Sequence, residues 1–302
     1  MGLCAMLLAL VTLAGCSVSP MVKRASAFAT AATAAAKDTT NAYALVEQTH
    51  HDAEVQAMIA NFDKEGFHPE KIKPFMSAQD MTARTKILDG LSKYAETLAY
   101  IGGDQPMTDF DTQAEALGKS LQDLSATGSI GAFLQSSNVT GVDVNLATTA
   151  VDALGRALIE HKRSRELPAL LKEMNGPITQ ICALLEADIG DPEKSGLRNQ
   201  LKNDYETLKR RQITFIRDNE GKMSVSDKRA LLEELAKMAD DEAAGDKTLA
   251  ATQAALKQLA ATHAALAESG NAKEAPVFRT MLSELMNDSQ QLQGFYSKLP
   301  AQ

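Results

Sequence analysis

The chain has 302 residues, of which 44% are hydrophobic, 23% are charged and 5% are aromatic, with no Trp and only 9 Pro. The small aromatic fraction argues against an all-β sandwich, and the abundant Ala, Leu, Gln, Lys and Glu residues favour helices. The 39 Asp and Glu outnumber the 31 Lys and Arg, giving a formal net charge of −8. This balance argues against a dedicated nucleic-acid-binding protein, which would carry a positive face.

The amino-terminal segment carries no charged side chain before Lys23, and its apolar part runs from Leu3 to Leu13. That run has the length of a secretory signal core and is shorter than the roughly 20 residues of a membrane-spanning helix. It is followed by Leu13-Ala14-Gly15-Cys16, in which small residues precede a cysteine. This motif resembles the lipobox of bacterial lipoproteins. The positive residue that usually begins such a signal is missing, so an earlier start or an uncleaved anchor stays open.

The resemblance implies that residues 1–15 are a signal peptide and that the thiol of Cys16 becomes lipidated. Two or three acyl chains hold a protein firmly, since each buried CH₂ contributes about 0.8 kcal/mol. In that family, a Ser directly after the cysteine, here Ser17, directs the protein to the outer membrane, facing the periplasm. We therefore expect a bacterial envelope protein whose membrane contact is its lipid. Cys182 is then alone and is expected to pack as a small buried hydrophobe. His263 falls in a leucine seam of a predicted helix and is expected to be an interior or rim histidine rather than a metal ligand.

The remainder predicts successive helices with almost no strand pattern. Expected helices run from 21 to 64, 77 to 101, 110 to 124, 146 to 158, 178 to 185, 192 to 219, 226 to 266 and 277 to 298. A break is expected at 175–177, where Pro177 would begin a helix, and Ser226 is the expected cap of the long helix after it. Glu242 and Gly245 interrupt the heptad pattern of that helix, which favours an antiparallel bundle over a free coiled coil.

These elements predict an all-α fold, an elongated antiparallel helical bundle of about seven or eight helices. Residues 16–126 form a lipid-anchored long-helix region, 127–145 an uncharged loop containing Gly and Ser, and 146–302 a C-terminal helical bundle. The last region is either separate or one domain with 16–126.

Two groups of residues are candidate sites. Glu47, His50, His51 and Glu54 have helical spacings that could hold a metal, but di-iron bundles need a second Glu-x-x-His copy, which the chain lacks, so a solvated polar face is the preferred interpretation. The stretch from 156 to 217 is locally basic, and its clusters could form one patch for an anionic partner. That patch would comprise Lys162, Arg163, Arg165, Lys209, Arg210 and Arg211. Solvated helix ends are the alternative.

No phosphate-binding loop, nucleophile elbow or zinc motif occurs, so neither a catalytic residue nor a cofactor is predicted. The favoured hypothesis is a non-enzymatic binding or scaffold module whose partner is another envelope protein or an anionic envelope polymer. One alternative is a membrane-acting protein that inserts the uncharged segment 124–142. Another is an envelope metal-binding protein or enzyme.

Overall fold

The computed structural model describes residues 20–60, 62, 66–101, 108–136, 139, 141–160, 167–269 and 275–296. Within these ranges the chain forms nine α-helices and two short 3₁₀ turns, with no strand beyond an isolated bridge between Asp191 and Ser195. The predicted all-α fold is therefore confirmed.

The helices have the following bounds. They are α1 (Pro20–Ala60), η1 (Pro69–Lys71), α3 (Ala78–Ile101), α4 (Thr108–Ala126), α5 (Ser129–Ser136), α6 (Val144–Glu160), α7 (Leu167–Ile189), α8 (Gly196–Asn219), η3 (Glu220–Lys222), α9 (Val225–Glu268) and α10 (Ala275–Tyr296). Among the described residues, no helix is long and apolar enough to cross a bilayer.

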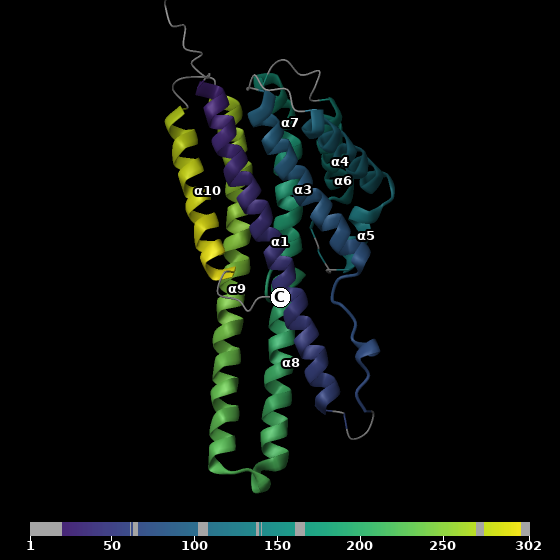
Figure 1. Ribbon diagram of the computed structural model, residues 1–302, viewed down its shortest axis with the longest axis vertical. Helices are drawn as coiled ribbons and strands as arrows, with labels where there is room; N and C mark the ends of the chain where they lie inside the picture. The colour runs from purple at the N-terminus through teal and green to yellow at the C-terminus, as the bar shows by residue number, and fades with distance from the viewer. Residues whose placement is uncertain are drawn as a thin grey trace, which may run out of the picture.

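The molecule is elongated, with its longest helices along one axis (Figure 1). Helix α1 packs against α3, α8, α9 and α10, while α4, α5 and α6 form a layer beside α3. Helices α8 and α9 form a hairpin that projects beyond the other helices, at the end opposite the start of α1 (Figure 1). We call the end that holds the start of α1 the base, and the end of the hairpin the tip.

One continuous cluster of buried apolar side chains connects the helices of the base half, from Ala25 in α1 to Leu292 in α10. The small side chains of α1 allow its neighbours to approach closely. Helices α4 and α6 are closer still, because a Cβ on Gly118 would lie 2.6 Å from the carbonyl oxygen of Gly155. Side chains from both sides of the predicted 127–145 division belong to this one cluster.

A fully buried ion pair lies inside the base half. The Arg84 guanidinium of α3 donates to both carboxylate oxygens of Asp188 in α7, over 2.7 and 2.8 Å. Its carbon lies 4.7 Å from the centre of the Phe133 ring of α5 and 5.6 Å from that of Tyr43 in α1. Removing one partner of such a pair leaves a buried charge uncompensated, so the pair fixes how these four helices assemble.

Two expectations about single residues are confirmed. His263 is fully buried, hydrogen-bonded to the hydroxyl of Tyr94 at 2.9 Å and near Asn175, as expected for an interior histidine. Burial lowers the pKa of His263 to about 4, so the ring is neutral at pH 7. Cys182 is fully buried, and burial raises the pKa of its thiol. It is therefore the inert packing residue that the sequence predicted.

The expected loop at 127–145 contains a helix, α5, so the interpretation of this segment as a loop was wrong. Ile130, Phe133 and Leu134 have the i, i+3, i+4 spacing of one helix face, and all three are buried. Their burial outweighs the flexibility of the surrounding Gly and Ser residues. Ile130, Phe133 and Leu134, which the membrane-acting alternative would insert into a bilayer, are thus part of the core.

The expected break at 175–177 was also wrong, because α7 continues through Pro177. A proline inside a helix costs about 3 kcal/mol. Met174, Ile178 and Ile181 keep helical spacing across it and are buried, and each buried apolar side chain contributes about 1.5–3 kcal/mol. Burial therefore exceeds the cost of the proline. Similarly, the cap of α9 lies two residues earlier than expected, at Ser224 instead of Ser226.

Candidate interaction surface

The projecting hairpin begins at a tight turn between α7 and α8. Gly190 and Gly196 have φ values of +76° and +81° there, and a Cβ on Gly190 would lie 2.1 Å from the carbonyl oxygen of Ser195. The backbone N–H of Asp191 donates to that same oxygen over 2.9 Å. This turn starts α8 just below the end of α7, where it leaves the core (Figure 1).

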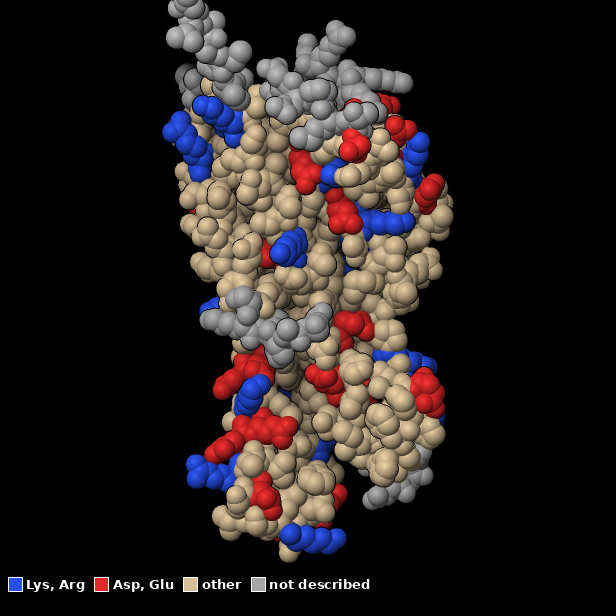
Figure 2. Space-filling model, in the orientation of Figure 1, with Lys and Arg blue, Asp and Glu red and all other residues tan. Residues whose placement is uncertain are grey.

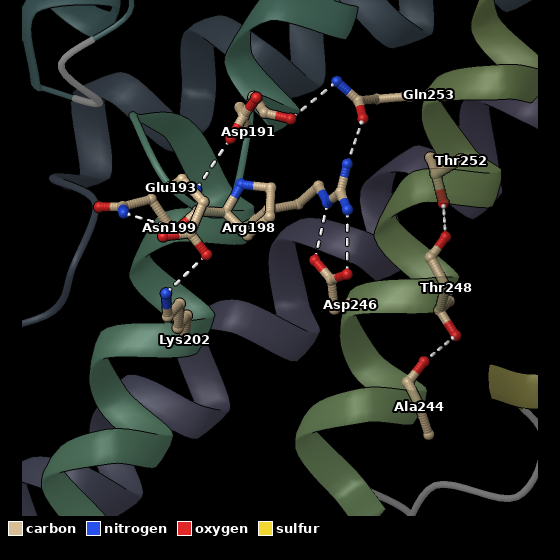
Figure 3. Close-up of polar contacts among 12 residues, drawn as sticks. Asp191, Glu193, Arg198, Asn199, Lys202, Ala244, Asp246, Thr248, Thr252 and Gln253 are labelled. Atoms are coloured by element: carbon tan, nitrogen blue, oxygen red, sulfur yellow. Dashed lines mark hydrogen bonds and ion pairs between the residues drawn. The ribbon is translucent and has the colours of Figure 1, made fainter.

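A group of hydrogen bonds, which we call the stem clamp, fixes the root of the hairpin (Figure 3). Arg198 of α8 donates to both carboxylate oxygens of Asp246 in α9, over 2.7 and 2.9 Å, and to the amide oxygen of Gln253 over 3.2 Å. Gln253 in turn donates to the carbonyl oxygens of Glu186 and Gly190. The bidentate contact restricts orientation as well as distance. The clamp thereby joins α7, α8 and α9.

The two residues that interrupt the heptad pattern of α9 are points of contact with α8. Glu242 forms an ion pair with Lys209, and Gly245 faces Leu201 so closely that a Cβ would lie 2.9 Å from a Leu201 methyl. Farther toward the tip, Gln212 of α8 donates to Glu234 of α9 over 2.9 Å. The two residues that interrupt the heptad pattern therefore hold α8 and α9 together and do not weaken the hairpin.

The tip exposes large apolar side chains. A capping box between Ser224 and Asp227 begins α9, so the first turn of α9, at the tip, is well formed. Exposed fractions beside it are 86% for Val225, 57% for Leu232 and 53% for Phe215. Exposed apolar side chains that are grouped on one element mark an interaction site more often than single ones do.

A groove of about 350 Å³ lies between α1, α8 and α9 on the base side of the tip. Apolar parts of its surface come mainly from Val55, Leu208 and Met238, together with the ring of Tyr205. Carboxylates border it on both sides, and the cation that the described lining contains is paired with one of them. These charged residues are Asp52 of α1 with Glu234, Asp241 and Lys237 of α9, where Lys237 binds Asp241 over 2.7 Å.

The metal candidates have other partners. The carboxylate of Glu47 accepts the backbone N–H groups of Phe75 and Met76, each over 3.1 Å. His50 contacts Asp204 of α8 over 3.1 Å, and burial raises the pKa of Asp204, an effect that hydrogen bonds from Gln200 and His50 partly offset. These contacts join α1 to α8 and to the segment before α3.

The other two metal candidates, His51 and Glu54, do not join these pairs. His51 is 53% exposed and lies 3.7 Å from Asp52, whereas Glu54 is half-buried on α1. His51 lies on a solvated polar face of α1, as the preferred interpretation expects, whereas the His50 side chain is only 17% exposed and contacts α8. Over the part of the chain that the structure describes, no group of three or more potential metal ligands occurs.

Half of the expected basic patch, Lys162, Arg163 and Arg165, lies outside the described residues. In the other half, Lys209 is paired with Glu242, whereas Arg210 is exposed and Arg211 is half-buried. Positive and negative side chains alternate over the tip half of the molecule (Figure 2). Two cations of α8 are thus opposed by carboxylates of α9, Arg198 by Asp246 and Lys209 by Glu242, which the count along the sequence did not reveal.

The fold and this surface define an elongated all-α bundle with a projecting two-helix arm and an acidic groove at its side. No family model, no curated protein and no solved structure matches the chain. Neither the arm nor the groove was identified from the sequence. The sequence signal that could have revealed the arm is the interruption of the heptad pattern at Glu242 and Gly245. A polar and a small residue in an apolar seam indicate a partner helix that carries a cation and a large apolar side chain at the matching positions.

Proposed function

We propose that this protein is a lipid-anchored, non-enzymatic binding module of the bacterial envelope, and that the α8–α9 hairpin is the arm that contacts another protein. The observation that carries the proposal is the position of the exposed apolar tip at the end of the molecule opposite the start of α1 (Figure 1).

The short distance between Cys16 and the start of α1 supports an orientation with the base toward the membrane and the tip away from it. Helix α1 begins at Pro20, four residues after Cys16, and four Cα steps of about 3.8 Å reach at most about 15 Å. An acyl group on Cys16 would therefore keep the base near the membrane surface.

The length of α9 supports it as well. This helix has 44 residues, which at about 1.5 Å each extend about 66 Å from the tip to the base. Its last turn lies beside the first turns of α1, because Arg24 donates to the carbonyl oxygen of Ser269. The arm would hold its apolar side chains far from the lipid and within reach of an envelope protein.

The first prediction concerns the anchor and the tip in intact bacteria that express the full chain. Labelled palmitate should enter the wild-type protein but not Cys16→Ser, which should also leave the membrane fraction. A photoreactive amino acid at Leu232 should give a discrete cross-linked protein. The same probe at Leu146 in α6, which is 52% exposed, is the matched control and should not give that product.

Two outcomes would contradict the proposal. A native protein whose sulfur at position 16 is bare, with residues 1–15 still attached, removes the anchor. Identical cross-linked products from positions 232 and 146 remove the arm as the contact surface.

A further inference from the structure

The groove continues a space that α10 fills nearer the base. There α10 packs on both α1 and α9, where Ser289 donates to Asp38 of α1 over 2.6 Å and Gln258 of α9 donates to the carbonyl oxygen of Met281 over 3.1 Å. Helix α10 ends at Tyr296, about midway along α9 (Figure 1). Toward the tip, α1 and α9 border the groove together with α8. The groove therefore lies where a helix of another chain could place one or two side chains between α1, α8 and α9.

The charge of the groove restricts what that helix carries. Asp52, Glu234 and Asp241 contribute three carboxylates, against which Lys237 is the one cation among the described residues of the lining. Its apolar centre would accept one or two aliphatic side chains. The complementary surface is a helix face with cations on either side of an apolar residue.

This chain carries such a face on α8. Arg210, Ile213 and Arg217 follow at steps of three and four residues, so they form one stripe along the helix, and all three are exposed. Arg217 also contacts Asp218 of its own helix over 3.3 Å, an exposed pair that contributes little and can exchange for another carboxylate. Ile213 is 54% exposed. Two residues of α8 that line the groove, Tyr205 and Leu208, each precede a stripe residue by five positions, a rotation of about 140°. The stripe thus faces away from the groove of its own chain.

We propose that the stripe of one copy occupies the groove of a second copy. Because the two surfaces lie on opposite sides of α8, the contact is head-to-tail and leaves one stripe and one groove free for further copies. The stripe and the α8 side of the groove lie within about two helical turns of each other along α8. If the copies share a membrane, their tips point the same way, and this small axial offset lets the stripe of one copy meet the groove of the next.

The contact can be tested with two differently tagged full-length chains expressed in the same bacteria, one carrying Val55→Cys in the groove and the other Ile213→Cys in the stripe. A disulfide needs Cα atoms within about 7 Å, so the proposal predicts a mixed disulfide dimer on a non-reducing gel. Val144→Cys in α6, which is 40% exposed, replaces Val55→Cys as the control and should give none. Each cysteine variant expressed alone shows the background from the native cysteines.

Charge reversal gives the second arm of the experiment. Arg210→Glu with Arg217→Glu in the stripe chain should lower the yield of mixed dimer by about tenfold or more, since like charges then face each other. Adding Asp52→Lys with Glu234→Lys to the groove chain should restore it. Arg156→Glu with Lys119→Glu, on the α4–α6 layer, is the matched control and should change nothing. Circular dichroism of each purified chain verifies that it is folded.

Each alternative occupant has its own result. If folded chains give no mixed dimer, or if a photoreactive amino acid at position 55 cross-links to another protein instead, self-association is overturned. If deleting residues 297–302 raises maleimide labelling of Val55→Cys while no dimer forms, the chain's own C-terminal segment is the occupant. The anchor and the tip are tested separately, so either proposal can fail alone.

Discussion

Asp38 is a carboxylate that folding transfers from water to the interior of the protein. It is fully buried between α1 and α10, and over the described part of the chain its Oδ1 atom has no hydrogen-bond partner while Oδ2 accepts from Ser289. Burial raises the pKa of Asp38 to about 6, partly opposed by the Ser289 hydrogen bond and by Lys37. The group therefore binds a proton more tightly in the folded than in the unfolded chain.

The pH dependence follows from that difference in pKa. Since the folded pKa is the higher one, the contribution of Asp38 to stability is greatest below about pH 4 and is lost as the pH rises to about 6 and above. We predict that Asp38→Asn raises the free energy of unfolding at pH 8 by about 3 kcal/mol and gives little gain at pH 4. Urea denaturation at both pH values measures this difference.

The matched control is Asp240→Asn, on the exposed side of α9, which should leave the pH profile of the wild type unchanged. Parallel profiles for wild type and Asp38→Asn would show that this carboxylate titrates alike in both states.

At the same scale, sequence reasoning succeeded where a residue's neighbours in the chain share its environment. His263 and Cys182 lie on faces made of Leu and Ile, so their burial was predictable. Asp38 follows Lys37 and precedes two Thr residues, and nothing in that polar stretch indicates that α10 covers it. The pairing of Glu47 with the backbone of Phe75 and Met76 was equally hidden, because it depends on where a distant segment returns.

Among the elements, the hairpin depends on its stem clamp for direction. Arg198 and Asp246 are 18% and 36% exposed in their side chains, so their bidentate contact is partly shielded from water. A pair of this kind contributes more than an exposed one, whose contribution is about 0–1 kcal/mol.

We predict that Arg198→Ala widens the distribution of distances between spin labels at Leu232 in the arm and Val277 in α10. Loss of the clamp lets α8 and α9 change their angle to α7, whereas helix content stays the same. Asp246→Ala should act alike, and the double variant should add little, because both residues belong to one contact. Arg229→Ala removes an exposed pair within α9 and is the control. An unchanged distribution in Arg198→Ala would assign the arm's direction to packing alone.

Elements were predictable from periodicity when their apolar spacing was regular, as in α3, α4 and the base half of α9. The errors occurred at residues that usually end or weaken helices. Pro177 and the Gly and Ser residues around α5 weaken a helix locally, but tertiary burial of Met174, Ile178 and Phe133 decides the outcome. That burial depends on partners in other helices, which a single sequence does not specify.

For the whole molecule, the shared core and the free arm predict two levels of stability. Apolar residues of the base half belong to one buried cluster that crosses the predicted 127–145 division, whereas α9 has no buried residue before Gly245. Local opening is easiest where few side chains are buried.

Hydrogen exchange should therefore show α3, α6 and α7 exchanging together, through one global transition. Amides from about 210 to 240 should exchange faster, through local opening of the arm. The predicted division into 16–126 and 146–302 is contradicted if these two regions exchange as one unit, and supported if they separate under mild denaturant.

The class and elongation of the fold were accessible from composition and period, but the direction in which a hairpin leaves a bundle was not. Direction depends on the turn at Gly190 and Gly196 and on Arg198, three positions that look ordinary in the sequence. The groove was harder still to predict from the sequence, because it exists only where three helices diverge and α10 ends.

Helix α9 runs without interruption from Val225 at the tip to Glu268 beside Arg24 at the base. A continuous rod transmits an axial force with little loss, whereas a chain of short helices and loops would absorb it. Traction on the far end of this strut is thus delivered to the first turns of α1.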